Sequence, residues 1–170
     1  EGESHPFWEF VYVDKGEVTA FAGDKAHVLK QGDIIFHKPG EWHNIQSNGI
    51  VAPNVAIVSF ECKSRSMDYF DGKILKVGQY QKGIISKIIS EYTNAFSTPF
   101  NDPYTNKLER KQNQPIGAEQ LLKMYISELL ISFMRSTLPE HQYPMININQ
   151  SASTLNMLIT YMQDNLKTTV

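Results

Sequence analysis

Two histidines and a glutamate in the first part of the chain have the residue types and spacing of a polar binding site. His5 and Glu9 lie four residues apart in an aromatic segment, and His43 follows a turn that contains Pro39 and Gly40. A carboxylate and two imidazoles can bind the polar groups of a small molecule, and both also suit divalent iron, manganese or zinc. These residues therefore predict a ligand pocket or a metal site, if the fold brings them together.

The segment that must position them has the pattern of antiparallel strands between about residues 7 and 62. Short runs of β-branched and aromatic residues alternate with turns that contain glycine. This regular spacing is typical of a small barrel or sandwich. We therefore expect strands at residues 7–13, 18–21, 26–29, 33–37, 45–46 and 55–61.

After about Lys76 the apolar pattern changes to the helical period of about 3.6 residues. A polar linker interrupts the helical pattern at residues 139–150. The last apolar stripe has nothing downstream to cover it, and we therefore expect the chain to continue past Val170. The stripes predict helices within residues 84–96, 118–133 and 154–166.

Two segments resemble the motifs of the cupin superfamily. Residues 32–44 are similar to the second cupin motif, in which a Gly turn, a strand and a Pro-Gly turn return a histidine to the barrel wall. Residues 5–13 with Gly16 and Glu17 are similar to the first motif, although Glu3 stands where the family has its first histidine. The resemblance implies a mainly β fold with α-helices, in which a cupin-like double-stranded β-helix, or jelly-roll barrel, precedes a helical dimerisation element.

The same residues resemble the amino-terminal effector domain of AraC-type transcription regulators. The resemblance rests on residues 8–16, the Gly32-Asp33 turn and residues 39–43, all at the expected separations. It implies a small-molecule effector of the sugar type, no cofactor, and a homodimer formed through the helices. It also implies that DNA is bound only through a truncated carboxy-terminal helix-turn-helix domain, of which residues 154–166 resemble the opening helix.

The resemblance implies four parts of the chain. These are an effector-binding barrel at 1–77, a dimerisation element at 78–138, a linker at 139–150 and the first helix of the truncated domain at 151–170. The expected ligand-binding residues are His5, Phe7, Glu9, Trp42 and His43, with the Trp42 ring as a stacking surface. The expected dimerisation residues are Leu122, Tyr125, Leu129 and Phe133.

Several alternatives stay open at this stage. A metal-dependent cupin enzyme, such as an isomerase or dioxygenase, would use His5, Glu9 and His43 as ligands, with Glu3 as a fourth. A pure assembly module with a filled barrel would bind no small molecule. Two further alternatives are independent of these: His43 could only bond a backbone carbonyl in the barrel wall, and the stripe of the second helix could pack only on its own barrel.

Composition excludes several function classes. The 170 residues carry 16 basic and 18 acidic side chains, a net charge of −2, and the basic residues are scattered, so no nucleic-acid footprint is evident. The longest apolar runs are far shorter than the roughly 20 residues of a membrane span. A single cysteine, Cys62, fits a reducing compartment and a cytoplasmic protein. The sequence has no nucleophile elbow or phosphate-binding loop, and so we expect no enzymatic activity.

Overall fold

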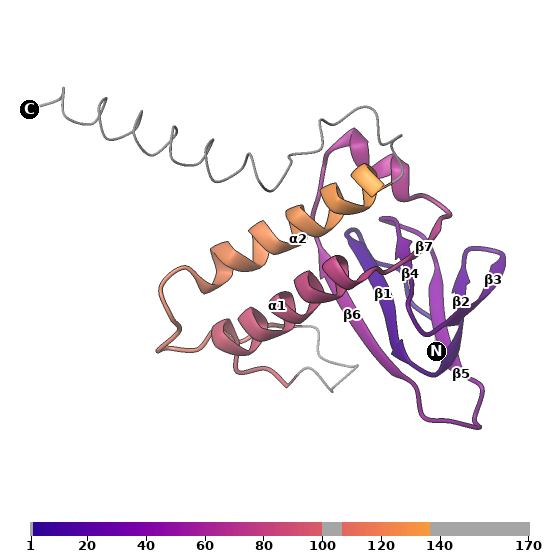
Figure 1. Ribbon diagram of the computed structural model, residues 1–170, viewed down its shortest axis with the longest axis horizontal. Coiled ribbons are helices and arrows are strands. Elements are labelled where there is room, and N and C mark those ends of the chain that lie inside the picture. The colour runs from indigo at the N-terminus through magenta and orange to yellow at the C-terminus, as the bar shows by residue number, and fades with distance from the viewer. Residues whose placement is uncertain (1, 100–106, 137–170) are drawn as a thin grey trace, which may run out of the picture. The chain divides into compact units, whose positions relative to one another are not determined.

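The computed structural model describes residues 2–99 and 107–136, which form two antiparallel sheets followed by two helices (Figure 1). All six predicted strands are present, and the mainly β fold with α-helices is confirmed. A 3-10 helix (Arg65–Phe70) and β7 (Ile74–Lys76) were not predicted, because both are too short to show a period. The larger sheet has the order β6 (Asn54–Phe60), β1 (Trp8–Lys15), β4 (Asp33–His37) and β7, and the smaller sheet has the order β3 (Lys25–Lys30), β2 (Glu17–Ala22) and β5 (His43–Ser47).

The two sheets face each other through a shared apolar core. Because side chains alternate along a strand, Val11 and Val13 of β1 point into this core, whereas Phe10 and Tyr12 point to the opposite face. The sheets are thus two walls around one interior, as expected of a cupin-like fold. The buried members of the core between the sheets are Val11, Val13, Val18, Ala20, Leu29 and Ile35.

The outer face of the larger sheet is covered by α1 (Gln79–Ala95) and α2 (Ala118–Ser136) (Figure 1). The ring of Phe36 in β4 lies 5.8 Å from that of Phe10 in β1 and 6.2 Å from that of Phe133 in α2, measured between ring centroids. The helices therefore share one continuous core with β1 and β4. None of the helices in the described residues is long and apolar enough to cross a membrane.

The buried face of α2 corrects part of the expected dimerisation surface. Leu129 and Phe133 are 0% and 2% exposed and belong to the core against the sheet, so their side chains cannot meet a partner. Leu122 and Tyr125 are half-buried against the same core. The outward face of α2 instead carries Met124 and Ile131 among its exposed residues. The predicted third helix, at 154–166, lies outside the described residues.

The turn before β4 forms as the sequence predicts. Gly32 adopts a φ of +87°, which glycine accommodates without strain, and the carboxylate of Asp33 accepts a hydrogen bond of 2.9 Å from the Lys30 amide. The Gly32 carbonyl accepts from the amide of Val77 at 2.8 Å. These bonds fix the start of β4, the strand that leads to the Pro39-Gly40 turn and His43.

Candidate functional site

At one end of the space between the sheets, the apolar core gives way to polar side chains. Glu9 of β1 pairs in register with Ser59 of β6 on one side and His37 of β4 on the other. Paired residues point to the same face, and Glu9 shares its face with Val11, so this polar row faces the smaller sheet. His43, the first residue of β5, meets the row from that sheet.

The N-terminal arm, residues 2–6, brings two further side chains to this end. The amide of Glu3 donates to the carbonyl of His43, and the amide of His43 donates to the carbonyl of Glu3, both at 2.9 Å. The amide of Gly40 donates to the carbonyl of His5 at 2.9 Å. The backbone therefore holds the arm beside the Pro39-Gly40 turn, and His5 and Glu3 lie next to Glu9 and His43.

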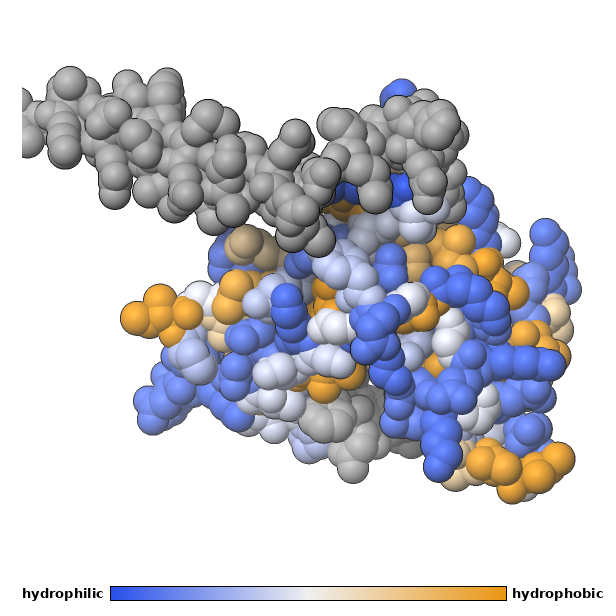
Figure 2. All heavy atoms as spheres, viewed as in Figure 1, coloured by the Kyte–Doolittle hydropathy of each residue, from blue (hydrophilic) through white to orange (hydrophobic). Residues whose placement is uncertain are grey.

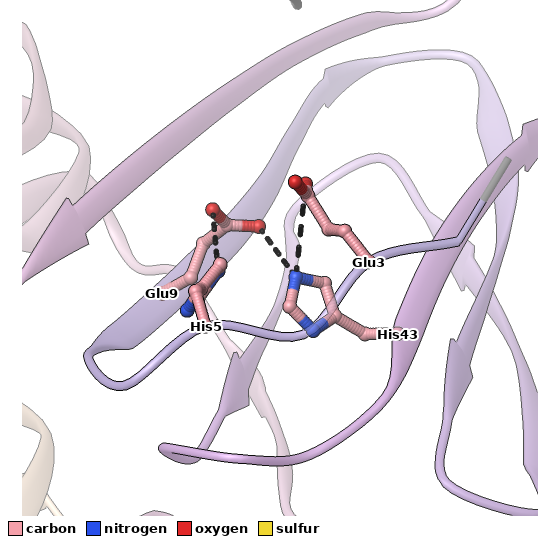
Figure 3. Close-up of side chains that lie close together, drawn as sticks. All are labelled: Glu3, His5, Glu9 and His43. Atoms are coloured by element: carbon pink, nitrogen blue, oxygen red, sulfur yellow. Dashed lines mark ion pairs between the residues drawn. The ribbon is translucent and has the colours of Figure 1, made fainter. Parts of the chain in front are cut away.

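The carboxylate of Glu9 lies between two imidazoles (Figure 3). Its Oε2 is 3.4 Å from Nε2 of His5, and its Oε1 is 3.5 Å from Nε2 of His43. The hydroxyl of Ser59 donates to Oε2 at 2.8 Å. The carboxylate of Glu3, which is exposed, approaches Nε2 of His43 at 3.9 Å. The buried charge of Glu9 is thus surrounded by groups that can neutralise it.

Three histidines of the site are held through their Nδ1 atoms. Nδ1 of His5 lies 3.0 Å from the carbonyl of Phe7, and Nδ1 of His43 lies 2.9 Å from the carbonyl of Glu41. Nδ1 of His37 lies 3.2 Å from a carboxylate oxygen of Glu41. Because these oxygens can only accept, each Nδ1 carries the proton. Each ring is then left with Nε2 as its second site, which is unprotonated in a neutral imidazole and protonated in a charged one.

The Nε2 atoms of these histidines are buried, and within the described part of the chain none of them has a hydrogen-bond partner. Buried polar atoms are normally satisfied, so such a group is a sign of a ligand, an ion or an ordered water molecule. Three of them at one end of the sandwich make this cluster the candidate functional site.

The pKa values of Glu9 and His43 shift in opposite directions. Burial alone would raise the pKa of Glu9, but the nearby imidazole of His43 and the hydrogen bond from Ser59 outweigh it and bring the pKa below the ordinary 4.5. Burial alone would lower the pKa of His43, but the nearby carboxylate of Glu9 and the hydrogen bond to the Glu41 carbonyl raise it above 6.5. The two side chains therefore stabilise each other as an ion pair. Burial lowers the pKa of His37 below 6.5, despite its bond to Glu41.

The structure brings together three of the predicted ligand-binding residues, His5, Glu9 and His43. Phe7 supports the cluster from outside, because its ring stacks on His5 with centroids 3.9 Å apart. Trp42 lies elsewhere. Its side chain is 47% exposed, and its indole packs so closely on Gly2 that the ring leaves no room for a Cβ atom there.

Sequence reasoning missed His37, Glu41 and Ser59. His37 and Ser59 reach the site only through the pairing of β1 with β4 and β6, which is a long-range property of the sheet. The alternation of Asp33, Ile35 and His37 along one strand was a signal that could have identified His37 as facing the interior. Glu41 positions both His37 and His43, one through its carboxylate and the other through its carbonyl.

The cluster also fits a divalent metal ion. Glu3, His5, Glu9 and His43 each offer one donor atom, and these four atoms lie within 4.8 Å of one another. Imidazole and carboxylate are suitable ligands for zinc, iron or manganese, and a ligating histidine usually has its other nitrogen bonded to a carbonyl or carboxylate, as here. The residues present therefore fit the metal that the cupin motifs imply.

A family model matches the front of the chain. Residues 2–60 match the model of a family described as the AraC-like ligand binding domain. This confirms the resemblance to AraC-type regulators for the segment that contains the whole cluster. No curated protein sequence matches the chain.

Solved structures similar to the chain include ToxT from Vibrio cholerae in its apo form, with 10% identity, a TM-score of 0.48, and coverage of 89% of this chain and 56% of that one. They also include YcfD, a ribosomal oxygenase from Escherichia coli, with 14% identity, a TM-score of 0.32, and coverage of 82% and 35%. Oxalate decarboxylase of B. subtilis has 14% identity, a TM-score of 0.34, and coverage of 71% and 32%. The chain thus spans only part of the length of each.

The Glu9–His43 pair predicts a pH-dependent contribution to folding. Because the pKa of Glu9 is lowered, its contribution is present above pH 4.5 and is lost as the pH falls further. Because the pKa of His43 is raised, its contribution is present below pH 6.5 and is lost as the pH rises through the folded-state value. We expect Glu9→Gln to lower the free energy of unfolding by about 1.5–3 kcal/mol between these limits.

We would test this expectation by urea unfolding from about pH 2.5 to pH 9 in the presence of EDTA, so that both sides of the window are covered. The loss caused by Glu9→Gln should shrink on both sides of the window. Glu17→Gln, at the start of β2 and away from the cluster, is the matched control. A loss of equal size at every pH would contradict the ion pair.

Proposed function

We propose that the chain is the effector-binding and dimerisation part of a cytoplasmic AraC-type transcription regulator. The observation that carries the proposal is the buried cluster in which the Nε2 atoms of His5 and His43 flank the carboxylate of Glu9 and the Nε2 atom of His37 has no hydrogen-bond partner among the described residues. The cluster lies within the segment that matches an AraC-like ligand binding domain. A polar organic molecule placed there would satisfy groups that the protein leaves without partners.

The proposed effector is a small, hydroxyl-bearing molecule of the sugar type. Its hydroxyl groups would donate to Glu9 and to Nε2 of His5, and Ser59 would keep one oxygen of Glu9 in place. An effector changes a conformational equilibrium only if it binds one arrangement of the protein better than another. The N-terminal arm carries Glu3 and His5, so an effector bound to these residues would favour one position of the arm over another. The arm and the helices would pass this change to an attached DNA-binding domain.

We also propose that the regulator is a homodimer, formed through the outward face of α2. Met124 and Ile131 are 55% and 47% exposed and lie about two helical turns apart. In a two-fold antiparallel helix pair, Met124 would contact Ile131 of the partner subunit, and the same contact would form twice. A groove of about 710 Å³ beside these residues is lined by Tyr80 and other side chains of both helices. On the face seen in Figure 2, hydrophobic residues lie in separate small groups among hydrophilic ones.

A metal-dependent cupin enzyme is the second candidate function, and it is favoured by the four convergent donors of the cluster. Glu3, His5, Glu9 and His43 would hold the ion. The ion would supply Lewis-acid polarisation of a bound oxygen. Glu9 and His43 must then lose their mutual ion pair, because a ligating imidazole is unprotonated at the bonding nitrogen.

The effector proposal is tested by a thermal-shift screen of the chain against a metabolite library rich in monosaccharides and polyols. At about 100 times its dissociation constant, a ligand should stabilise the fold by roughly 2.7 kcal/mol. His43→Gln should remove the shift, because it removes the imidazole that faces Glu9. His27→Gln, on β3 and outside the cluster, should retain it. A library without any stabilising compound would favour the assembly module with a filled interior.

The dimer proposal is tested with two variants. Sedimentation measures the self-association of Met124→Glu, and urea unfolding measures the stability of Phe133→Ala. Met124→Glu should weaken self-association at least tenfold without a loss of fold, because the side chain is exposed and introduces a charge at the contact. Phe133→Ala should lower the free energy of unfolding by about 3–5 kcal/mol, because it empties a buried site against the sheet. If Met124→Glu associates as the parent chain does, the interface lies elsewhere.

The hypothesis of a metal-dependent enzyme is tested by elemental analysis of the purified chain before and after dialysis against EDTA. Stoichiometric iron, manganese or zinc that is lost in His43→Ala would favour the enzyme. Less than about one tenth of an equivalent of any metal, together with an effector that stabilises the EDTA-treated chain, is the result expected of the sensor.

A further inference from the structure

We propose that the effector site extends to His37 and that it accepts an organic molecule with at least two separate hydrogen-bond donors, one held by Glu9 and another by Nε2 of His37. This inference rests on the proposed effector-binding function, which it makes more specific. It adds His37 as a specificity-determining residue and excludes a single ion as the sole occupant of the site.

The position of His37 supports this assignment. Its side chain is 0% exposed, and the residue pairs directly with Glu9 across the β1–β4 ladder. It shares the inward face of β4 with Ile35, which belongs to the core between the sheets. Its Nδ1 is held by Glu41, and its Nε2 has no partner among the described residues. A buried acceptor left in this state costs free energy unless a donor reaches it.

The orientation of the rings decides what kind of ligand can reach it. The rings of His37 and His43 are stacked, with centroids 4.5 Å apart and an interplanar angle of 12°. The lone pair of Nε2 lies in the plane of its ring, so two parallel stacked rings cannot direct these lone pairs at one atom. The rings of His5 and His43 meet at 71° and can converge. His37 therefore defines a second position, which a ligand reaches only with a second group.

The charges around the site indicate the chemical class of that ligand. The carboxylates of Glu3, Glu9 and Glu41 all lie beside the histidines. They disfavour an anionic ligand and favour hydroxyl or ammonium donors. His37 itself is suited to accept, because its Nδ1 is bonded to the carboxylate of Glu41 and its neutral imidazole then has Nε2 as an acceptor. A polyol or an amino alcohol carries two or more donors of this kind.

The inference is tested by titration calorimetry of EDTA-treated chain with probes that stabilise it in a thermal-shift panel of monosaccharides, linear polyols and amino alcohols. His37→Phe keeps an aromatic ring next to His43 and removes Nε2, and it should weaken binding of the probe about tenfold or more. His27→Phe is the matched control and should leave the affinity within about twofold. Circular dichroism confirms that both variants are folded.

A second measurement needs no substitution at His37. In long-range proton–nitrogen NMR spectra of the ¹⁵N-histidine-labelled parent chain, His37 should show an unprotonated Nε2 whose resonance moves when the probe is added. If His37→Phe binds normally and the resonance does not move, while His43→Gln abolishes binding, His37 contacts only a water molecule and the inference is overturned. In that case the proposed function stands. If no probe in the panel stabilises the parent chain, both are contradicted.

Discussion

The buried carboxylate of Glu9 is the constraint on which the rest of the site depends. An ionised carboxylate between two sheets is costly unless charged or hydrogen-bonding groups surround it. Ser59 supplies one hydrogen bond from the neighbouring strand, and His5 and His43 supply two imidazoles. His5 is in place only if the N-terminal arm pairs with the backbone near His43. The Pro39-Gly40 turn must in turn return His43 to the interior.

Much of this arrangement could be predicted because it is encoded locally. Each expected strand is bounded by a turn that glycine favours, and the Gly32-Asp33 turn forms with the hydrogen bond that Asp33 suggests. The pairing of His5, Glu9 and His43 followed from motif resemblance and from the spacing of the turn. His37 and Ser59 were missed because neither is near Glu9 in the sequence. Only the register of three strands makes them neighbours.

Two expectations needed information that a single chain segment does not contain. Trp42 is adjacent to His43, but neighbouring residues of an extended chain point in opposite directions, and the Trp42 ring packs on Gly2 instead. The sequence predicts the apolar stripe of α2, but the helical period does not determine which surface covers that stripe. The larger sheet covers Leu129 and Phe133, because the aromatic face of β1 and β4 also requires burial. The face available to a partner is the opposite one.

One sheet serves both the site and the helices, and this places a physical requirement on any sensor built from it. Glu9 and His37 face the interior, whereas the adjacent residues Phe10 and Phe36 pack with Phe133 of α2 on the other side. Close-packed side chains transmit a displacement of the backbone between them rather than absorb it. A ligand that only fills the interior would leave α2 where it is. A ligand that binds more tightly when β1 and β4 shift must also repack the aromatic contacts with α2, and its differential affinity sets how far that equilibrium moves.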